Sequence, residues 1–208
     1  MTATELIEPQ RLRRVVLVVA GLNVGYAAVE MSVALAIGSV SLLADSVDFL
    51  EDAAVNLLIA LALGWPLARR ALAGHVMAGI ILVPAVVAAW QAVSKAFDPE
   101  PPDVTLLIVT AAGAAVVNTV CSLLLVRVRH HGGSLSGAAY LSARNDVVVN
   151  VAIIVMALVT AWTASGWPDI ALGAVIVAVN GKAAWEVWGL AGEERLAARA
   201  LAGEDLDD

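Results

Sequence analysis

The chain has 208 residues, of which 61% are hydrophobic and only 15% are charged, and its mean hydropathy is +0.86. An average soluble domain is about half apolar and about a quarter charged, so this chain has too few charges to cover a soluble surface. The composition excludes a disordered chain, the single cysteine excludes a disulfide-stapled secreted domain, and the net charge of -7 without a basic stripe excludes a nucleic-acid binder. The class of protein that remains is a membrane protein with several membrane-spanning segments.

Six apolar stretches are long enough to cross a bilayer as helices, which takes about 20 residues each. The stretches are rich in alanine and leucine and do not alternate with polar residues, which disfavours strands. The sequence therefore predicts an all-α polytopic membrane protein with spans at residues 15–37, 40–63, 72–94, 104–126, 136–162 and 168–189. The predicted organisation is a cytoplasmic N-terminal segment, a six-helix transmembrane domain and a short acidic cytoplasmic tail, at residues 1–14, 15–189 and 190–208.

The basic residues predict the orientation of these spans, because lysine and arginine are enriched in cytoplasmic loops. With the N-terminus in the cytoplasm, Lys95 is the one basic residue that falls outside, and Arg144 lies within the fifth span. The others fall on the inner side or low in the sixth span: Arg11, Arg13, Arg14, Arg69, Arg70, Arg127, Arg129, Lys182, Arg195 and Arg199. Both ends of the chain are therefore expected in the cytoplasm.

The second span carries four acids within eight residues, Asp45-Ser46-Val47-Asp48-Phe49-Leu50-Glu51-Asp52. Asp45, Asp48 and Asp52 stand at i, i+3 and i+7, so they share one helical face, and Asn56 extends it by another turn. Two carboxylates at i and i+4 can grip one cation, and without a cation they repel each other or share a proton. The alternative is an amphipathic surface helix with solvated acids, which the surrounding apolar run disfavours.

The fifth span contains Ser142-Ala143-Arg144-Asn145-Asp146. Ser142, Asn145 and Asp146 are predicted to share a face, with Arg144 nearly opposite. The span enters from the inner side and the second span from the outer side, so Asp146 and the pair Asp48 and Asp52 all lie about 8 to 12 residues deep, near the midplane where transporter sites tend to lie. The acids of the two spans are therefore expected to meet.

The first span adds Asn23, Tyr26 and Glu30 along one face. Glu30 is expected in the outer half of the membrane, level with Asp45. These two acids, with Asn23 and Asn56, could line a proton or ion path. Two protonated acids that hydrogen-bond between helices are an equally good interpretation.

These residues resemble the cation diffusion facilitator, or cation efflux, family of divalent-metal/proton antiporters. The resemblance rests on six spans with both ends inside, the approach Ser41-Leu42-Leu43-Ala44-Asp45, the pair Asp48 and Asp52, and Asp146. It implies a tetrahedral site for the transported metal, with four ligands at Asp48, Asp52, Ser142 and Asp146. It also implies a multi-pass protein of the cell membrane, here expected to be the inner membrane of a bacterium, and not an enzyme.

Two departures from the family pattern affect these expectations. The first position in the fifth span is usually histidine or aspartate, whereas Ser142 offers a neutral hydroxyl, so Asn145 or a water molecule is expected to supply the fourth bond. Family members also usually carry a cytoplasmic domain that senses metal and supports a dimer. This chain is expected to be a short member of the family without that domain. A homodimer is therefore possible, but it would lack the support of the cytoplasmic domain.

The expected mechanism is export of the metal from the cytoplasm, with no permanently bound cofactor, in exchange for protons that re-protonate the carboxylates. Family frequency favours Zn²⁺, with Cd²⁺ or Co²⁺ beside it, whereas ligation by oxygen alone favours Mn²⁺, Mg²⁺ or Fe²⁺. Two other classes remain: a passive cation or proton channel, and a membrane-embedded metalloenzyme. The sequence contains no His-Glu-x-x-His, Gly-x-Ser-x-Gly or phosphate-binding motif, which disfavours the enzyme and ATP-driven transport.

Overall fold

The computed structural model describes residues 9–62, 67–128 and 133–179. These residues fold into helices joined by short turns, and they contain no strand, so the predicted all-α class is confirmed. In chain order the helices are α1 (Pro9–Ile37), α2 (Val40–Ala62), α3 (Leu67–Ala96), α4 (Val104–Val126), α5 (Gly133–Thr163) and a shorter helix Trp167–Val179 that reaches the last described residue.

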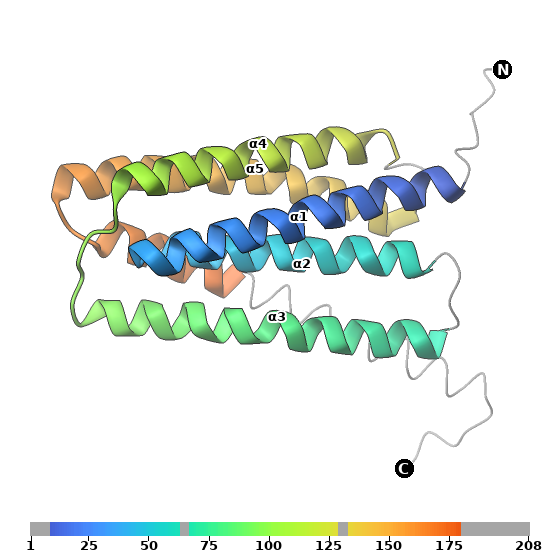
Figure 1. Cartoon of the computed structure of the whole chain (residues 1–208), viewed down its shortest axis with the longest axis horizontal. Coiled ribbons are helices and arrows are strands. Elements are labelled where there is room, and N and C mark those ends of the chain that lie inside the picture. The colour runs from blue at the N-terminus through green and yellow to red at the C-terminus, as the bar shows by residue number, and fades with distance from the viewer. Residues whose placement is uncertain (1–8, 63–66, 129–132, 180–208) are drawn as a thin grey trace, which may run out of the picture.

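The long helices run side by side in one bundle (Figure 1). α1 packs mainly against α2, and α4 mainly against α5, while α1 also contacts α4 and α2 also contacts α5. α3 packs on the outside of α2. α2 therefore lies among α1, α3 and α5, which is why its acidic face is enclosed by protein.

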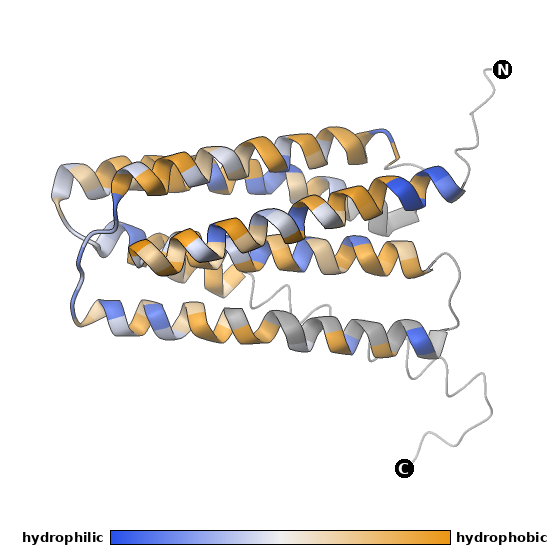
Figure 2. Cartoon of the chain, viewed as in Figure 1, coloured by the Kyte–Doolittle hydropathy of each residue, from blue (hydrophilic) through white to orange (hydrophobic). Residues whose placement is uncertain are grey.

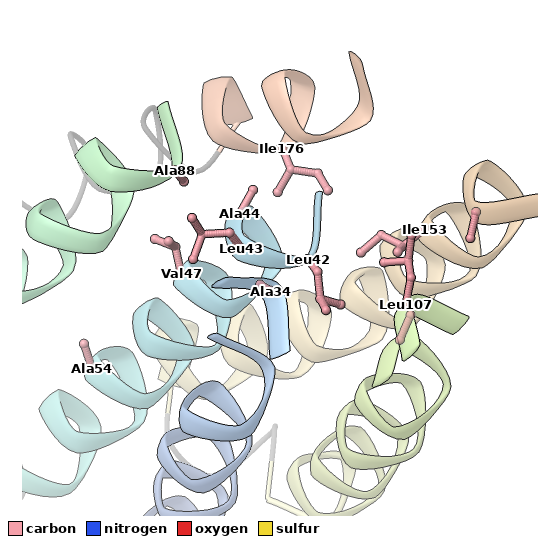
Figure 3. Close-up of a cluster of buried hydrophobic side chains, with 12 residues drawn as sticks. Ala34, Leu42, Leu43, Ala44, Val47, Ala54, Ala88, Leu107, Ile153 and Ile176 are labelled. Carbon is pink, nitrogen blue, oxygen red and sulfur yellow. The ribbon is translucent and has the colours of Figure 1, made fainter. Parts of the chain in front are cut away.

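Where Figure 2 colours the helices, hydrophobic residues make up most of their length. Three helical segments are long and apolar enough to cross a membrane: Gln10–Ile37, Val104–Val126 and Ala139–Thr163. The main core cluster joins α2 to its neighbours through side chains such as Leu42, Leu107, Ile153 and Ile176 (Figure 3). This cluster lies towards the N-terminal end of α2.

The predicted spans match the helices closely in the middle of the chain, and the span 104–126 has the same limits as α4. Two helices begin before the predicted spans, because α1 starts at Pro9 rather than at 15 and α3 at Leu67 rather than at 72. In α1 the extra turns are held by Leu12, which is buried in a cluster with Leu125 and Val128, so the helix continues beyond its apolar run. The end of the predicted sixth span and the predicted tail 190–208 lie outside the described residues.

Five exposed arginines gather at one end of the bundle, which we call the arginine end. Arg11, Arg13 and Arg14 lie in the first turns of α1, Arg69 lies at the start of α3, and Arg127 directly follows α4. Figure 1 shows these helix ends on the same side of the bundle. This grouping supports the predicted orientation, in which that side faces the cytoplasm.

The opposite end, which we call the capped end, contains the tight turn between α1 and α2. Gly38 has φ +68°, a conformation that residues with a side chain rarely adopt, and this conformation lets α2 follow α1 with only two residues between them. Two oxygens of the buried Asp169 carboxylate then accept four hydrogen bonds from residues at the start of α2. The donors are Val40 N (2.7 Å), Ser41 N (3.2 Å), Ser39 Oγ (2.7 Å) and Ser41 Oγ (2.5 Å).

Asp169 therefore caps α2 from a different helix. Its negative charge also suits the positive end of the α2 dipole. The two helices approach so closely that a Cβ atom on Gly173 would lie 2.6–2.7 Å from atoms of Val40 and Ser41. The cap fixes α2 along its own axis and so fixes the depth of the acids that α2 carries.

We expect Asp169→Ala to destabilise the protein by about 3 kcal/mol or more, because buried donors at the start of α2 lose their acceptor. The matched control is Asp103→Ala, which removes an exposed cap of α4 that accepts one hydrogen bond, from Leu106 N at 2.9 Å. That change is expected to cost about 1 kcal/mol. Thermal unfolding in detergent, followed by circular dichroism, compares the two. Equal losses of stability in the two variants would show that the buried Asp169 cap contributes no more to stability than the exposed Asp103 cap.

Candidate metal centre

The polar face of α2 lies inside the bundle. Asp45, Asp52 and Asn56 are buried, and Asp48, between them, is half-buried. A continuous row of polar groups thus runs through an otherwise apolar interior, as the spacing predicts. Glu51 is also buried, at 8% exposure, and its Oε1 has no partner among the described residues.

α5 brings two side chains to this row. Ser142 Oγ donates a hydrogen bond of 2.9 Å to Asp52 Oδ1. The Asp146 carboxyl lies at hydrogen-bonding distance from the side chains of both Asp48 and Asp52. Asp52 and Asp146 are each 7% exposed, so these contacts are made out of reach of bulk water. All four residues predicted as ligands therefore meet at one contact between α2 and α5.

The three carboxyl groups lie close together, with that of Asp146 near those of both Asp48 and Asp52. Among the described residues, no three histidine, cysteine, aspartate or glutamate side chains are placed to hold one ion together. Asp146 instead links Asp48 and Asp52. A hydrogen bond between two carboxyl groups requires a proton on one of them, because neither carboxylate can donate. Enclosed acids placed this close can share protons, and a metal bound among them would take the place of those protons.

Asn145, the predicted source of a fourth bond, is not brought to this group. Its side chain is exposed, as is that of the neighbouring Arg144. One residue along a helix turns the side chain by about 100°, and α5 directs Asp146 inwards, so Asn145 faces away from α2. A bond from Asn145 to a metal therefore stays a prediction, and Ser142 is the α5 side chain that hydrogen-bonds to Asp52.

The other predicted polar residues extend the row in both directions. Towards the capped end, the Glu30 carboxyl of α1 faces that of Asp45 at hydrogen-bonding distance. Towards the arginine end, Asn56 Nδ2 donates to the Asp52 carbonyl oxygen at 2.8 Å. Asn23, buried on α1, accepts a contact of 3.5 Å from Cys121 Sγ. Besides these carboxyls, several buried polar atoms have no partner among the described residues: Asn23 Nδ2, Asn56 Oδ1, Asn118 Oδ1 and Asn150 Oδ1.

Sequence reasoning missed Asn150, which contacts both Asp45 of α2 and the α5 backbone at Asp146. Its Nδ2 contacts both carboxylate oxygens of Asp45, at 3.1 and 3.3 Å, and also donates to the Asp146 carbonyl oxygen at 2.8 Å. The signal was its position four residues after Asp146, on the same face of the fifth span. His130 and His131 could also bind a metal ion by their chemistry, but they lie outside the described residues.

Comparison with known proteins shows which family has a sequence similar to that of this chain. A family model described as the cation efflux transmembrane domain matches residues 16–188. The chain belongs to the cation efflux family. It is 29% identical over 183 residues to the zinc transporter ZitB of Escherichia coli K12, in an alignment that covers 80% of this chain and 56% of ZitB. The same values hold for the zinc transporter ZitB of Shigella flexneri. The chain thus spans about half the length of these curated relatives.

The helices of this cation efflux domain place a neutral hydroxyl beside Asp52, where an imidazole would be a stronger ligand for zinc. We expect Ser142→His to raise the affinity for Zn²⁺ relative to Mn²⁺ by about tenfold, because nitrogen ligands suit zinc better than manganese. Isothermal titration of the purified protein in detergent measures both metals. The matched control is Ser94→His, at an exposed serine near the end of α3. An equal change in both variants would argue against a ligand position at residue 142.

Proposed function

We propose that this protein exports divalent metal cations from the cytoplasm in exchange for protons, and that the metal binds among Asp48, Asp52, Asp146 and Ser142. The observation that carries the proposal is the meeting of α2 and α5 carboxyl groups through Asp146, deep in the bundle. Membership of the cation efflux family supports it. The bacterial source of the relatives favours the cell membrane of a bacterium as the location, with the arginine end inside.

The proposed exchange follows from the charges of the three aspartates. Enclosed carboxylates repel one another, so the group is stable only when protons or a cation reduce its charge. A divalent metal and two protons carry the same charge, and either can therefore neutralise the group to the same extent. Metal entering from the cytoplasm displaces protons, and protons entering from the other side displace the metal. Exchange then needs no further source of energy than the proton gradient.

The proposed cargo is Zn²⁺, with Cd²⁺ and Co²⁺ as alternatives. The curated relatives are zinc transporters, which favours zinc. The donor atoms, however, are carboxylate and hydroxyl oxygens, which also suit Mn²⁺ and Fe²⁺. Zinc accepts carboxylate oxygens at about 2.0–2.2 Å, so this set of ligands can hold zinc with a water molecule completing the site.

Transport in proteoliposomes tests the proposal. We expect wild-type protein to accumulate Zn²⁺ under a pH gradient with saturation, and an internal pH dye to report proton movement that depends on the metal. Asp52→Asn and Asp146→Asn are expected to reduce this transport by about 100-fold, because each removes a charged ligand from the interior. The matched control is Asp98→Asn, which makes the same chemical change at an exposed acid between α3 and α4.

The outcomes separate a transporter from a channel. Flux that does not saturate, or that moves no protons in the opposite direction, would favour a passive channel and contradict the proposal. Transport at the wild-type level in Asp52→Asn and Asp146→Asn would show that these residues are not part of the transport site. The same vesicles rank Zn²⁺, Cd²⁺, Co²⁺, Mn²⁺ and Fe²⁺.

Metal affinity is expected to depend on pH, because carboxylates bind metal only after losing their protons. Lowering the pH should therefore weaken Zn²⁺ binding, by about tenfold per pH unit for each proton displaced. Titration in detergent at several pH values, in buffers with different heats of ionisation, gives both the affinity and the number of protons released. An affinity that is independent of pH, with no proton release, would contradict binding by protonated carboxyls.

A further inference from the structure

A second pair of carboxyl groups lies in the bundle, apart from Asp48, Asp52 and Asp146. Glu30 of α1 and Asp45 of α2 are both 0% exposed, and their carboxyl groups face each other at hydrogen-bonding distance. No N–H or hydroxyl group of a described residue donates to either oxygen of Glu30. Asp45 precedes Asp48 by almost one helical turn, so the pair lies between the Asp48 group and the capped end.

The two acids of this pair differ in their surroundings. Both oxygens of Asp45 lie near the Asn150 amide nitrogen, at 3.1 and 3.3 Å, and an amide donor stabilises a carboxylate. Glu30 receives no such donor, so its carboxyl group depends on Asp45 for a partner. A proton held by Glu30 and shared with Asp45 satisfies both groups at once.

The charges around the pair also require a proton. The charged groups that act on it are further acids: Asp48 on both members, and Asp52 on Asp45. The Tyr26 hydroxyl of α1 lies near both carboxyls but donates its hydrogen bond to the Thr110 carbonyl oxygen, at 2.6 Å. From α5 the neighbouring groups are the neutral Asn150 and, one turn away, Asp146. Two charged carboxylates in such a setting would repel each other without compensation.

A metal ion fits this pair poorly. The Asp45 oxygens are occupied by the Asn150 amide, and a hydrated cation would need space and several oxygen ligands, whereas both side chains are fully enclosed. The ligand that matches two facing, enclosed carboxyl groups is a single proton.

We propose that Glu30 and Asp45 form a proton-binding site, separate from the metal-binding carboxyls, with Asn150 hydrogen-bonded both to Asp45 and to the backbone of Asp146. The inference rests on the proposed function, because it assigns a location to one of the exchanged protons. The proton passes between this pair and the capped side of the membrane, and one proton leaves the pair for each one that it takes up. Asn150 contacts Asp45 through its side-chain amide and the backbone of Asp146 through the same nitrogen, so movement of α5 at Asp146 changes the environment of the pair.

The first test is direct and needs no transport. Infrared spectroscopy of the purified, metal-free protein at neutral pH should show the carbonyl stretch of protonated carboxylic acids, and Glu30→Gln should lose one such group. Glu100→Gln, at an exposed acid in the loop after α3, is the matched control and should leave the spectrum unchanged. An unchanged signal in Glu30→Gln would overturn the inference, whatever transport shows.

The second test separates proton coupling from metal binding. In proteoliposomes, Glu30→Gln should keep its Zn²⁺ affinity within about twofold of wild type but lose proton-driven Zn²⁺ accumulation by about tenfold or more. Glu30→Asp, which keeps an ionisable group, should recover part of the accumulation and shows that the position tolerates change. Proton-coupled transport at the wild-type level in Glu30→Gln, or a parallel loss of metal affinity, would overturn the inference. Absence of coupled transport in wild type would instead overturn the proposed function.

Discussion

Enclosing carboxyl groups in an apolar bundle is the constraint on which this structure depends. A buried carboxylate without a counter-charge is destabilising by several kcal/mol, so each acid must be protonated, hydrogen-bonded or bound to a cation. α2 places Asp45, Asp48 and Asp52 in such positions. Ser142 and Asn150 donate to some of the oxygens, and Asp146 and Glu30 add further acids rather than opposite charges. The folded chain therefore requires protons or a cation inside, which is the property that an exchanger of metal for protons needs.

The anchoring of α2 fixes the positions of these buried acids in the bundle. The first turn of α2 is anchored by Asp169 from the helix Trp167–Val179, and Gly173 lets the two helices touch. Each residue after that anchor adds about 1.5 Å along the axis, so the cap determines how deep Asp45, Asp48 and Asp52 lie. The stability of the capped end and the position of the proposed sites are thus two consequences of the same contact.

The sequence was sufficient for the features that depend on periodicity. The apolar runs predicted the helices, and the spacing of Asp45, Asp48 and Asp52 predicted one polar face that meets Asp146. Features that depend on contacts between distant segments were missed. The early start of α1 depends on Leu12 packing against α4, and the roles of Asn150 and Asp169 depend on helices far apart in the chain. A helical wheel allows a broad face that includes Asn145, whereas the contact with α2 involves Ser142, Asp146 and Asn150.

Metal binding between α2 and α5 can be located in a structure of the Zn²⁺-loaded protein, with anomalous scattering measured at the zinc edge. We expect one strong peak in the interior, with oxygen atoms of Asp48, Asp52 and Asp146 within about 2.0–2.2 Å of the ion. The hydrogen bond between Ser142 and Asp52 should then be replaced or rearranged. An interior peak bound by other residues, or an interior without zinc under saturating conditions, would contradict metal binding between α2 and α5.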